Sequence, residues 1–174
     1  MRTASSQPFF KSDLPVSSES QNDLILHLQK YDSKLKSDIA EYAVATRLLK
    51  FGFRVLKPIG DRLSYDLAID REGRLIRIQV KSAWLHQNYY TVDSRRTKTN
   101  RRHMLRCRYT DADFDFAIIY IQTLESFYVM PFAVFSQYKS GITFVERNTR
   151  QRAPKSFLYR EAWDLLRAVP KKGD

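Results

Sequence analysis

The spacing of hydrophobic and polar positions along this chain predicts a mixed domain of helices and strands. A helical period runs from about 34 to 51 and stops at Gly52, a residue that tolerates the left-handed turn after a helix. Runs of β-branched and aromatic residues predict strands at 53–57, 66–71, 74–83, 114–122, 127–131 and 142–147. Further helices are expected at 23–31, 132–138 and 159–168. The expected fold class is therefore α/β or α+β, with a central mixed β-sheet flanked by helices.

Length and composition favour one domain with one sizeable core. The Ser-rich segment 1–21 has no hydrophobic period and is expected to be a disordered leader, which leaves 22–174 as the domain. No stretch of about 18 apolar residues is present. A single cysteine, Cys107, excludes an intramolecular disulfide and a cysteine-based zinc site. We expect a cytoplasmic protein with no membrane partner, and the Ser-rich start leaves an organellar location open.

Net charge indicates the class of partner. The chain has 30 Lys and Arg against 19 Asp and Glu, a net charge of +11, which attracts polyanions at long range. A membrane surface would also suit this charge, but the Lys and Arg clusters do not show the strongly apolar helix face opposite a basic one that membrane binding requires. Nucleic acid is therefore the expected partner.

The basic residues concentrate in the segment at about 84–110. Between Asp93 and Asp111 there is no acid, and the cations there are Arg95, Arg96, Lys98, Arg101, Arg102, Arg106 and Arg108. A loop of this kind neutralises phosphates and places arginines against guanine edges in the major groove. The alternative is a solvated basic loop without a ligand. A second basic set, expected to contact the DNA backbone or another subunit, contains Arg147, Arg150, Arg152 and Lys155.

Glu41 is the first candidate site residue. Projection of the long helix at 100° per residue surrounds it with Tyr42, Val44, Ala45, Leu48 and Leu49. A carboxylate kept from water is costly unless it is paired or binds a metal. The alternative to a metal ligand is a buried glutamate bonded to an arginine or a backbone amide.

A hairpin supplies the other candidates. Glu72-Gly73 forms a two-residue turn, and pairing of Arg71 with Arg74 sets Asp66 opposite Gln79. The strand period puts Lys81 on the same face, whereas the apolar residues of both strands point to the other side.

This group of polar side chains suits the hydrolysis of a phosphodiester. Asp66 is the expected principal ligand of Mg²⁺, with Mn²⁺ as a substitute, and Glu41 completes the ligands from the helix. Gln79 would bind the metal or hold a ligand water, and Lys81 would orient the attacking water or stabilise the transition state. As a bare pattern, Asp followed by Gln-x-Lys is also common on half-exposed strands.

Three segments, DIAEYAVATRLLKFGFRVLKPIGD, SYDLAID and RLIRIQVKSA, resemble the PD-(D/E)XK endonucleases associated with group I introns. The resemblance covers about 35–145 and includes DFDFAIIYI and SFYVMPF, similar to the family's strand pair after the catalytic hairpin. It implies a restriction-endonuclease-like core with Glu41, Asp66, Gln79 and Lys81 as catalytic residues. It also implies a homing endonuclease that cuts double-stranded DNA as a homo-oligomer, a dimer or a tetramer.

The sequence departs from the superfamily pattern in two places. Tyr65 stands where proline is usual, and Gln79 stands where most members have an acid, although the intron-associated branch resembles this chain in using Gln. Loss of one negative charge weakens cation binding, so a non-cleaving nucleic-acid-binding module is one alternative function. A junction resolvase or a restriction enzyme of the same fold is another. The aromatic-rich segments 127–138 and 159–166 are expected to form either core or subunit contacts.

Overall fold

The computed structural model describes residues 33–60, 62–99, 104–145 and 154–169, all within one compact unit, and everything below concerns these residues. The predicted leader 1–21 and the predicted helix 23–31 lie outside them, as do Arg147, Arg150 and Arg152. Among the described helices, none has both the length and the apolar character needed to cross a bilayer.

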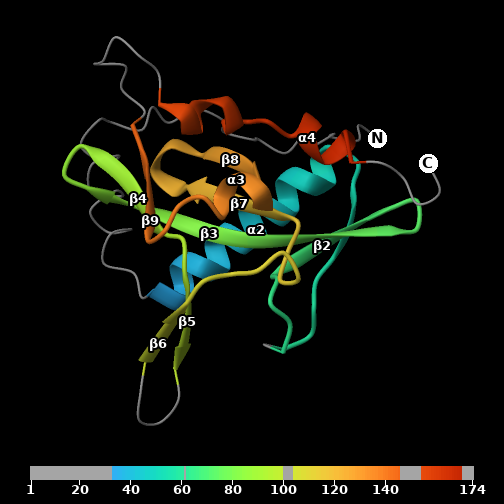
Figure 1. Ribbon diagram of the computed structural model, residues 1–174. Coiled ribbons are helices and arrows are strands. Elements are labelled where there is room, and N and C mark those ends of the chain that lie inside the picture. The colour runs from blue at the N-terminus through green and yellow to red at the C-terminus, as the bar shows by residue number, and fades with distance from the viewer. Residues whose placement is uncertain (1–32, 61, 100–103, 146–153, 170–174) are drawn as a thin grey trace, which may run out of the picture. The chain divides into compact units, whose positions relative to one another are not determined.

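A mixed β-sheet forms the centre of the fold (Figure 1). Its strands are β1 (Arg54–Leu56), β2 (Leu67–Arg71), β3 (Arg74–His86), β4 (Tyr89–Asp93), β7 (Phe116–Ile121), β8 (Ser126–Pro131) and β9 (Gly141–Phe144). The long strand β3 organises them, because it pairs with β2, β4 and β7 along different parts of its length. Only the β3–β7 pair is parallel, so the predicted mixed sheet is confirmed.

Helices pack on both faces of this sheet. They are α2 (Ser33–Lys50), α3 (Phe132–Phe135) and α4 (Asp164–Arg167), with two 3-10 turns, η1 (Gln122–Leu124) and η2 (Lys155–Tyr159). Successive residues of β7 serve opposite faces: Ile118 packs in the cluster that contains α2 and α4, and Ile119 packs in the cluster that contains α3. The predicted single helix at 159–168 is wrong, since η2 ends at Tyr159 and α4 spans only Asp164–Arg167.

The apolar face of α2 is narrower than the helical projection predicts. Its buried residues are Ala40, Val44 and Leu48, which repeat every four residues. Tyr42 and Leu49 are 65% and 60% exposed, so their predicted place around Glu41 on the buried face is wrong. Glu41 therefore lies beside the buried stripe and not at its centre.

The charge of the basic segment predicts a loop, but the segment forms a two-stranded ribbon. Strand β4 continues the main sheet, and then β5 (Arg96–Thr99) pairs antiparallel with β6 (Met104–Cys107) to form a separate sheet. This β5–β6 ribbon extends away from the main sheet (Figure 1). The Tyr-Tyr-Thr-Val sequence of β4 consists of residues that favour strands, but the many charged residues that follow it make this pattern hard to recognise.

The two aromatic-rich segments serve the interior of this chain. Residues Phe127 to Met130 are buried in β8, and Phe135, Trp163 and Leu166 are buried in the flanking helices and turn. Exposed aromatic and aliphatic side chains do occur at Phe157 (48%) and Leu158 (78%), both on η2. Of the two expectations for these segments, core or subunit contacts, their burial favours the core.

Candidate active site

One cavity brings together the four residues that the sequence singles out. It has a volume of about 450 Å³ and is lined by Glu41 from α2, Asp66 immediately before β2, and Gln79 and Lys81 from β3. Residues at the base of the β5–β6 ribbon, Arg95 among them, line its other side. The helix α2, the β2–β3 hairpin and the base of the basic ribbon thus line the same cavity.

The hairpin has the register that counting from the turn predicts. Arg71 pairs with Arg74, and the backbone N–H of Asp66 donates to the carbonyl of Ile78 at 3.0 Å. Asp66 consequently lies opposite Gln79, as predicted, although it precedes β2 and does not belong to it. Its position beyond the strand leaves the carboxylate free to turn into the cavity.

The carboxylate of Asp66 is held by the neighbouring strand. Its Oδ2 accepts the backbone N–H of Val80 at 2.7 Å and also the side-chain amide of Gln79. The pKa of Asp66 is raised to about 6, chiefly by burial and to a smaller extent by the nearby charge of Glu41. The Val80 hydrogen bond and the Lys81 ammonium oppose this rise in pKa. Asp66 is thus a carboxylate short of positive charge.

Gln79 leaves one side-chain oxygen available beside the Asp66 carboxylate. The side chain is only 9% exposed, and its Nε2 donates both to Asp66 and to the carbonyl of Val80, the latter at 3.2 Å. Its Oε1 accepts no hydrogen bond from any described residue. The amide therefore presents an unused acceptor beside a carboxylate without adding a second negative charge.

Glu41 is paired with a lysine. Its Oε2 lies 2.9 Å from Nζ of Lys57, and the two side chains are 21% and 47% exposed. The same ammonium lies 4.6 Å from the centre of the Tyr42 ring. The hydrogen bond to Glu41 raises the pKa of Lys57 above its ordinary value. Sequence reasoning allowed for an arginine or a backbone amide as the partner of Glu41 and did not consider Lys57.

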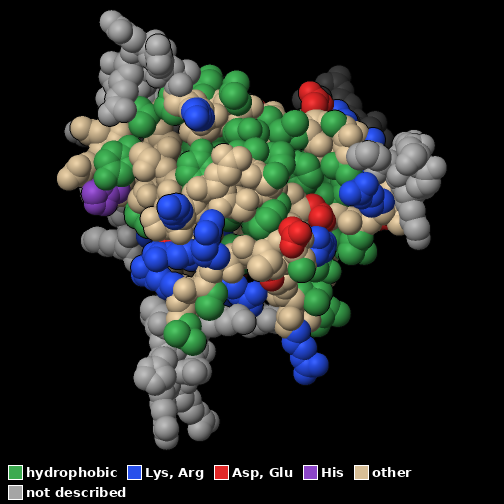
Figure 2. Space-filling model, in the orientation of Figure 1, with side chains coloured by type: hydrophobic (Ala, Val, Ile, Leu, Met, Phe, Trp, Pro, Cys, Tyr) green, Lys and Arg blue, Asp and Glu red, His purple; other side chains and the backbone are tan. Residues whose placement is uncertain are grey.

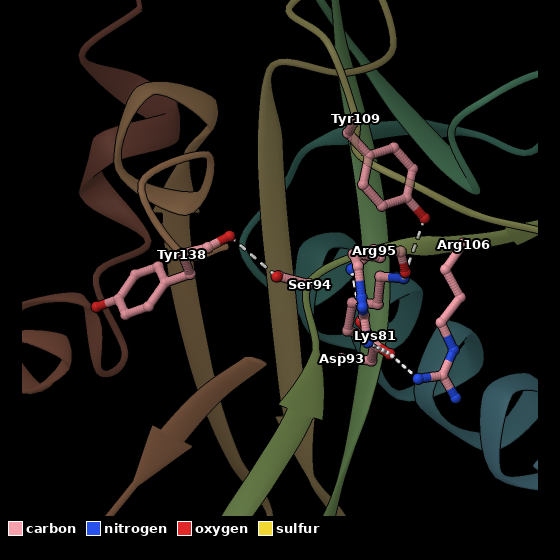
Figure 3. A network of polar contacts seen from close by, with 7 residues as sticks. All are labelled: Lys81, Asp93, Ser94, Arg95, Arg106, Tyr109 and Tyr138. Atoms are coloured by element: carbon pink, nitrogen blue, oxygen red, sulfur yellow. Dashed lines mark hydrogen bonds and ion pairs between the residues drawn. The ribbon is translucent and has the colours of Figure 1, made fainter. Parts of the chain in front are cut away.

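Lys81 is held at the base of the ribbon (Figure 3). Its Nζ donates to the carbonyl oxygen of Arg95 at 3.2 Å and to the hydroxyl of Tyr109 at 3.0 Å. Burial lowers the pKa of Lys81, while the charges of Asp66 and Asp93 raise it. An ammonium has three N–H donors, so one remains for a ligand in the cavity.

The ribbon cations that the structure describes are bound to oxygen atoms of the protein itself. The contacts are Arg95 Nε–Asp93 Oδ1 at 3.0 Å, Arg96 Nη1–Asp113 Oδ1 at 3.2 Å, Arg106 Nη1–Asp93 Oδ2 at 3.7 Å and Arg108 Nη2–Ser136 O at 2.7 Å. The side chains of Lys98, Arg101 and Arg102 lie outside the described part of the chain. Lys and Arg side chains gather where the ribbon leaves the main sheet (Figure 2).

Asp93, Lys57 and Tyr109 belong to this site although no sequence motif marks them. Hydrogen bonds from Arg95 hold the pKa of Asp93 below its ordinary value, against the opposite effect of its partial burial. Tyr109 is visible in the sequence only as an aromatic residue beside the basic run. Its contact with Lys81 spans 28 residues, so it becomes apparent only once the fold is known.

The donor atoms of the cavity fit a hard divalent cation. Carboxylate and amide oxygens are the preferred ligands of such ions, and the raised pKa of Asp66 marks the place where positive charge is lacking. Within the described residues, no three His, Cys, Asp or Glu side chains form a metal-binding group. Two carboxylates, of Glu41 and Asp66, and the amide of Gln79 are the set available in the cavity.

Comparisons with known proteins give this geometry its context. The family model of the PD-(D/E)XK endonucleases matches residues 31–166. In a solved structure described as a bacterial homing endonuclease, I-Ssp6803I, the sequence is 54% identical and the TM-score is 0.72. That match covers 78% of this chain and 93% of the other. No curated protein matches this chain.

The raised pKa of Asp66 predicts a pH-dependent gain in stability for Asp66→Asn without metal. Because the pKa in the folded protein lies above that of an unfolded aspartate, near 4, stability falls as pH rises from about 4 to about 6. At pH 7.5 in a chelator, we expect the free energy of unfolding of the variant to exceed that of the wild type by about 1–3 kcal/mol. Urea unfolding at several pH values measures this difference.

The gain should fade below pH 4, where Asp66 is neutral in both states. Asp164→Asn is the matched control, since that carboxylate is 96% exposed and should give no comparable gain. A stability difference at Asp66 that is absent at pH 7.5, or that does not change with pH, would contradict the inferred charge deficit.

Proposed function

This chain belongs to the PD-(D/E)XK endonuclease family, and from that premise we propose that it is a site-specific homing endonuclease acting on double-stranded DNA. The main observation in support is that Glu41, Asp66, Gln79 and Lys81 line one cavity together with residues at the base of the basic ribbon. The similarity to a bacterial homing endonuclease supports the homing activity. The resemblance of this chain to intron-associated members further suggests a group I intron as its genetic setting.

The chemistry proposed is hydrolysis of a phosphodiester. Water attacks phosphorus and the bond to the 3′ oxygen breaks, which leaves 5′-phosphate and 3′-hydroxyl ends. A divalent ion, proposed to be Mg²⁺, would supply Lewis acidity and lower the pKa of bound water. Asp66 and Glu41 would hold it by carboxylate oxygens, with Gln79 Oε1 as a neutral third ligand.

Lys81 has a separate role in this proposal. Two of its N–H donors go to Arg95 and Tyr109, and the third would be available to the phosphate or to the attacking water. A fixed cation of this kind stabilises charge that develops on the phosphate oxygens in the transition state. The charged group needs no reorientation during the reaction, because the protein already holds it.

The β5–β6 ribbon is proposed to hold the DNA. Arg106 of β6 is 54% exposed, and its partner Asp93 is 3.7 Å away. A phosphate would replace this carboxylate at small loss, because an exposed ion pair contributes at most about 1 kcal/mol. We also propose that the protein acts as a homo-oligomer, since two active sites are needed to cut both strands.

Cleavage of a diverse DNA library in magnesium tests the function. We expect discrete ends at one long motif, loss of all cleavage in chelator, and loss in Asp66→Ala but not in Asp164→Ala. Sequencing of the new ends measures this. A preference for branched DNA would point to a junction resolvase, and a short palindromic site to a restriction enzyme. Tight, salt-sensitive binding without any cleavage would leave a DNA-binding module on a nuclease fold.

A second prediction concerns the ribbon. Arg106→Ala should weaken DNA binding uniformly across sequences and reduce the slope of log K against log salt by about 1, because one phosphate contact is lost. Fluorescence anisotropy over a range of salt concentrations measures the slope. Arg74→Ala, at the start of β3 and away from the ribbon, is the control. Equal slopes for the wild type and Arg106→Ala would remove Arg106 from the DNA interface.

A further inference from the structure

The ammonium of Lys81 is held by both ends of the ribbon. The chain enters the ribbon through residues 93–95, the entry segment, and leaves it through residues 108–115, the exit segment. Lys81 donates to the Arg95 carbonyl of the entry segment and to the Tyr109 hydroxyl of the exit segment. Figure 3 shows the two partners converging on this one side chain. Lys81 therefore contacts both the entry segment and the exit segment of the ribbon.

The exit segment is fixed by an arginine of β3. Nη2 of Arg77 donates to the carbonyl of Asp111 at 3.0 Å and to Oδ1 of Asp115 at 2.9 Å, and Nε donates to Oδ2 of Asp115 at 3.1 Å. The backbone N–H of Arg77 donates to the same Oδ2 at 2.7 Å. Arg77 and Lys81 lie on the same strand, so β3 fixes both the segment that carries Tyr109 and the lysine that Tyr109 contacts.

The ring of Tyr109 is held independently of its hydroxyl. It packs edge-on against Phe114, with ring centres 5.0 Å apart, and against Phe135 at 6.3 Å. Nζ of Lys81 lies 4.9 Å from the centre of the Tyr109 ring, within the range of a cation–π contact. Phenylalanine would preserve all of these ring contacts. What tyrosine adds is one oxygen atom, 3.0 Å from the ammonium.

We propose that Tyr109 is a positioning residue for Lys81, and that through it the base of the DNA-contacting ribbon sets the place of the ammonium in the active site. The inference rests on the proposed function of Lys81 in hydrolysis. A lysine side chain has four rotatable bonds, and two fixed acceptors restrict where its ammonium can lie. Removal of one acceptor would release the ammonium from its place in the cavity.

Tyr109→Phe tests this inference because it removes only the hydroxyl. With wild-type cleavage established on a site recovered from the library, we expect the single-turnover cleavage rate to fall about 10- to 100-fold, the range for a lost hydrogen bond to a charged group. The dissociation constant for the same DNA, measured in chelator, should stay within about twofold of the wild type, because the ring and the ribbon remain in place.

Tyr138→Phe is the matched control. Tyr138 packs in the same buried cluster as Tyr109, and its backbone carbonyl accepts the hydroxyl of Ser94 in the entry segment. A general loosening of this region would therefore affect both variants, whereas the proposal predicts a slower cleavage rate only for Tyr109→Phe. Equal rates for Tyr109→Phe and the wild type would overturn the inference and leave the proposed function intact. A loss of DNA affinity that matches the loss of rate would also overturn it.

A readout without cleavage separates the inference from the proposed function. NMR relaxation of lysine labelled with ¹³C at the ε carbon reports the mobility of each lysine, and Lys81→Met identifies the Lys81 signal. We expect Lys81 to be more mobile in Tyr109→Phe than in the wild type and in Tyr138→Phe. Equal mobility in the three proteins would overturn the positioning role. A wild type that cuts no DNA but shows this difference would refute the nuclease proposal alone.

Discussion

Partial withdrawal of the Asp66 carboxylate from water is the constraint on which the rest of the site depends. Burial is the main reason that its pKa is raised to about 6, and the Val80 N–H, Lys81 and Lys57 offset this rise only in part. The partners that it does have, the Val80 N–H and the Gln79 amide, both come from the adjacent strand. An acid in place of Gln79 would add a like charge against Asp66, whereas the neutral amide donates a hydrogen bond to it. The remaining deficit is what a divalent cation would fill.

Strand β3 connects the residues of the cavity to the basic ribbon. It carries Gln79 and Lys81, binds the exit segment of the ribbon through Arg77, and continues into the hairpin with β4 that leads to the ribbon. The described arginines of the ribbon are paired with carboxylates or carbonyls of the protein, so DNA would exchange one set of anionic partners for another. Such an exchange limits the affinity gained from each phosphate. It also keeps a concentrated positive charge from repelling itself in the free protein.

The sequence predicts those parts of the site that depend on local rules. Counting from the Glu72-Gly73 turn sets Asp66 opposite Gln79, because the register of a tight hairpin follows from its turn. The helical period predicts α2 but not its buried stripe, since Tyr42 and Leu49 satisfy the same period and are nevertheless exposed. Local rules predict neither the strands of the ribbon nor the contact between Tyr109 and Lys81. Strand pairing between charged residues leaves no alternating apolar pattern, and a contact across 28 residues has no local signal.

The most direct test of the metal site is a crystal structure of the protein grown with Mn²⁺, with anomalous diffraction data to locate the ion. We expect an anomalous peak in the cavity between Asp66, Gln79 and Glu41, with Glu41 released from Lys57. We also expect the peak to be absent in Asp66→Asn crystals grown in the same way. An empty cavity in the wild type, or a peak bound by other residues alone, would contradict the assignment of this cavity as the metal-dependent active site.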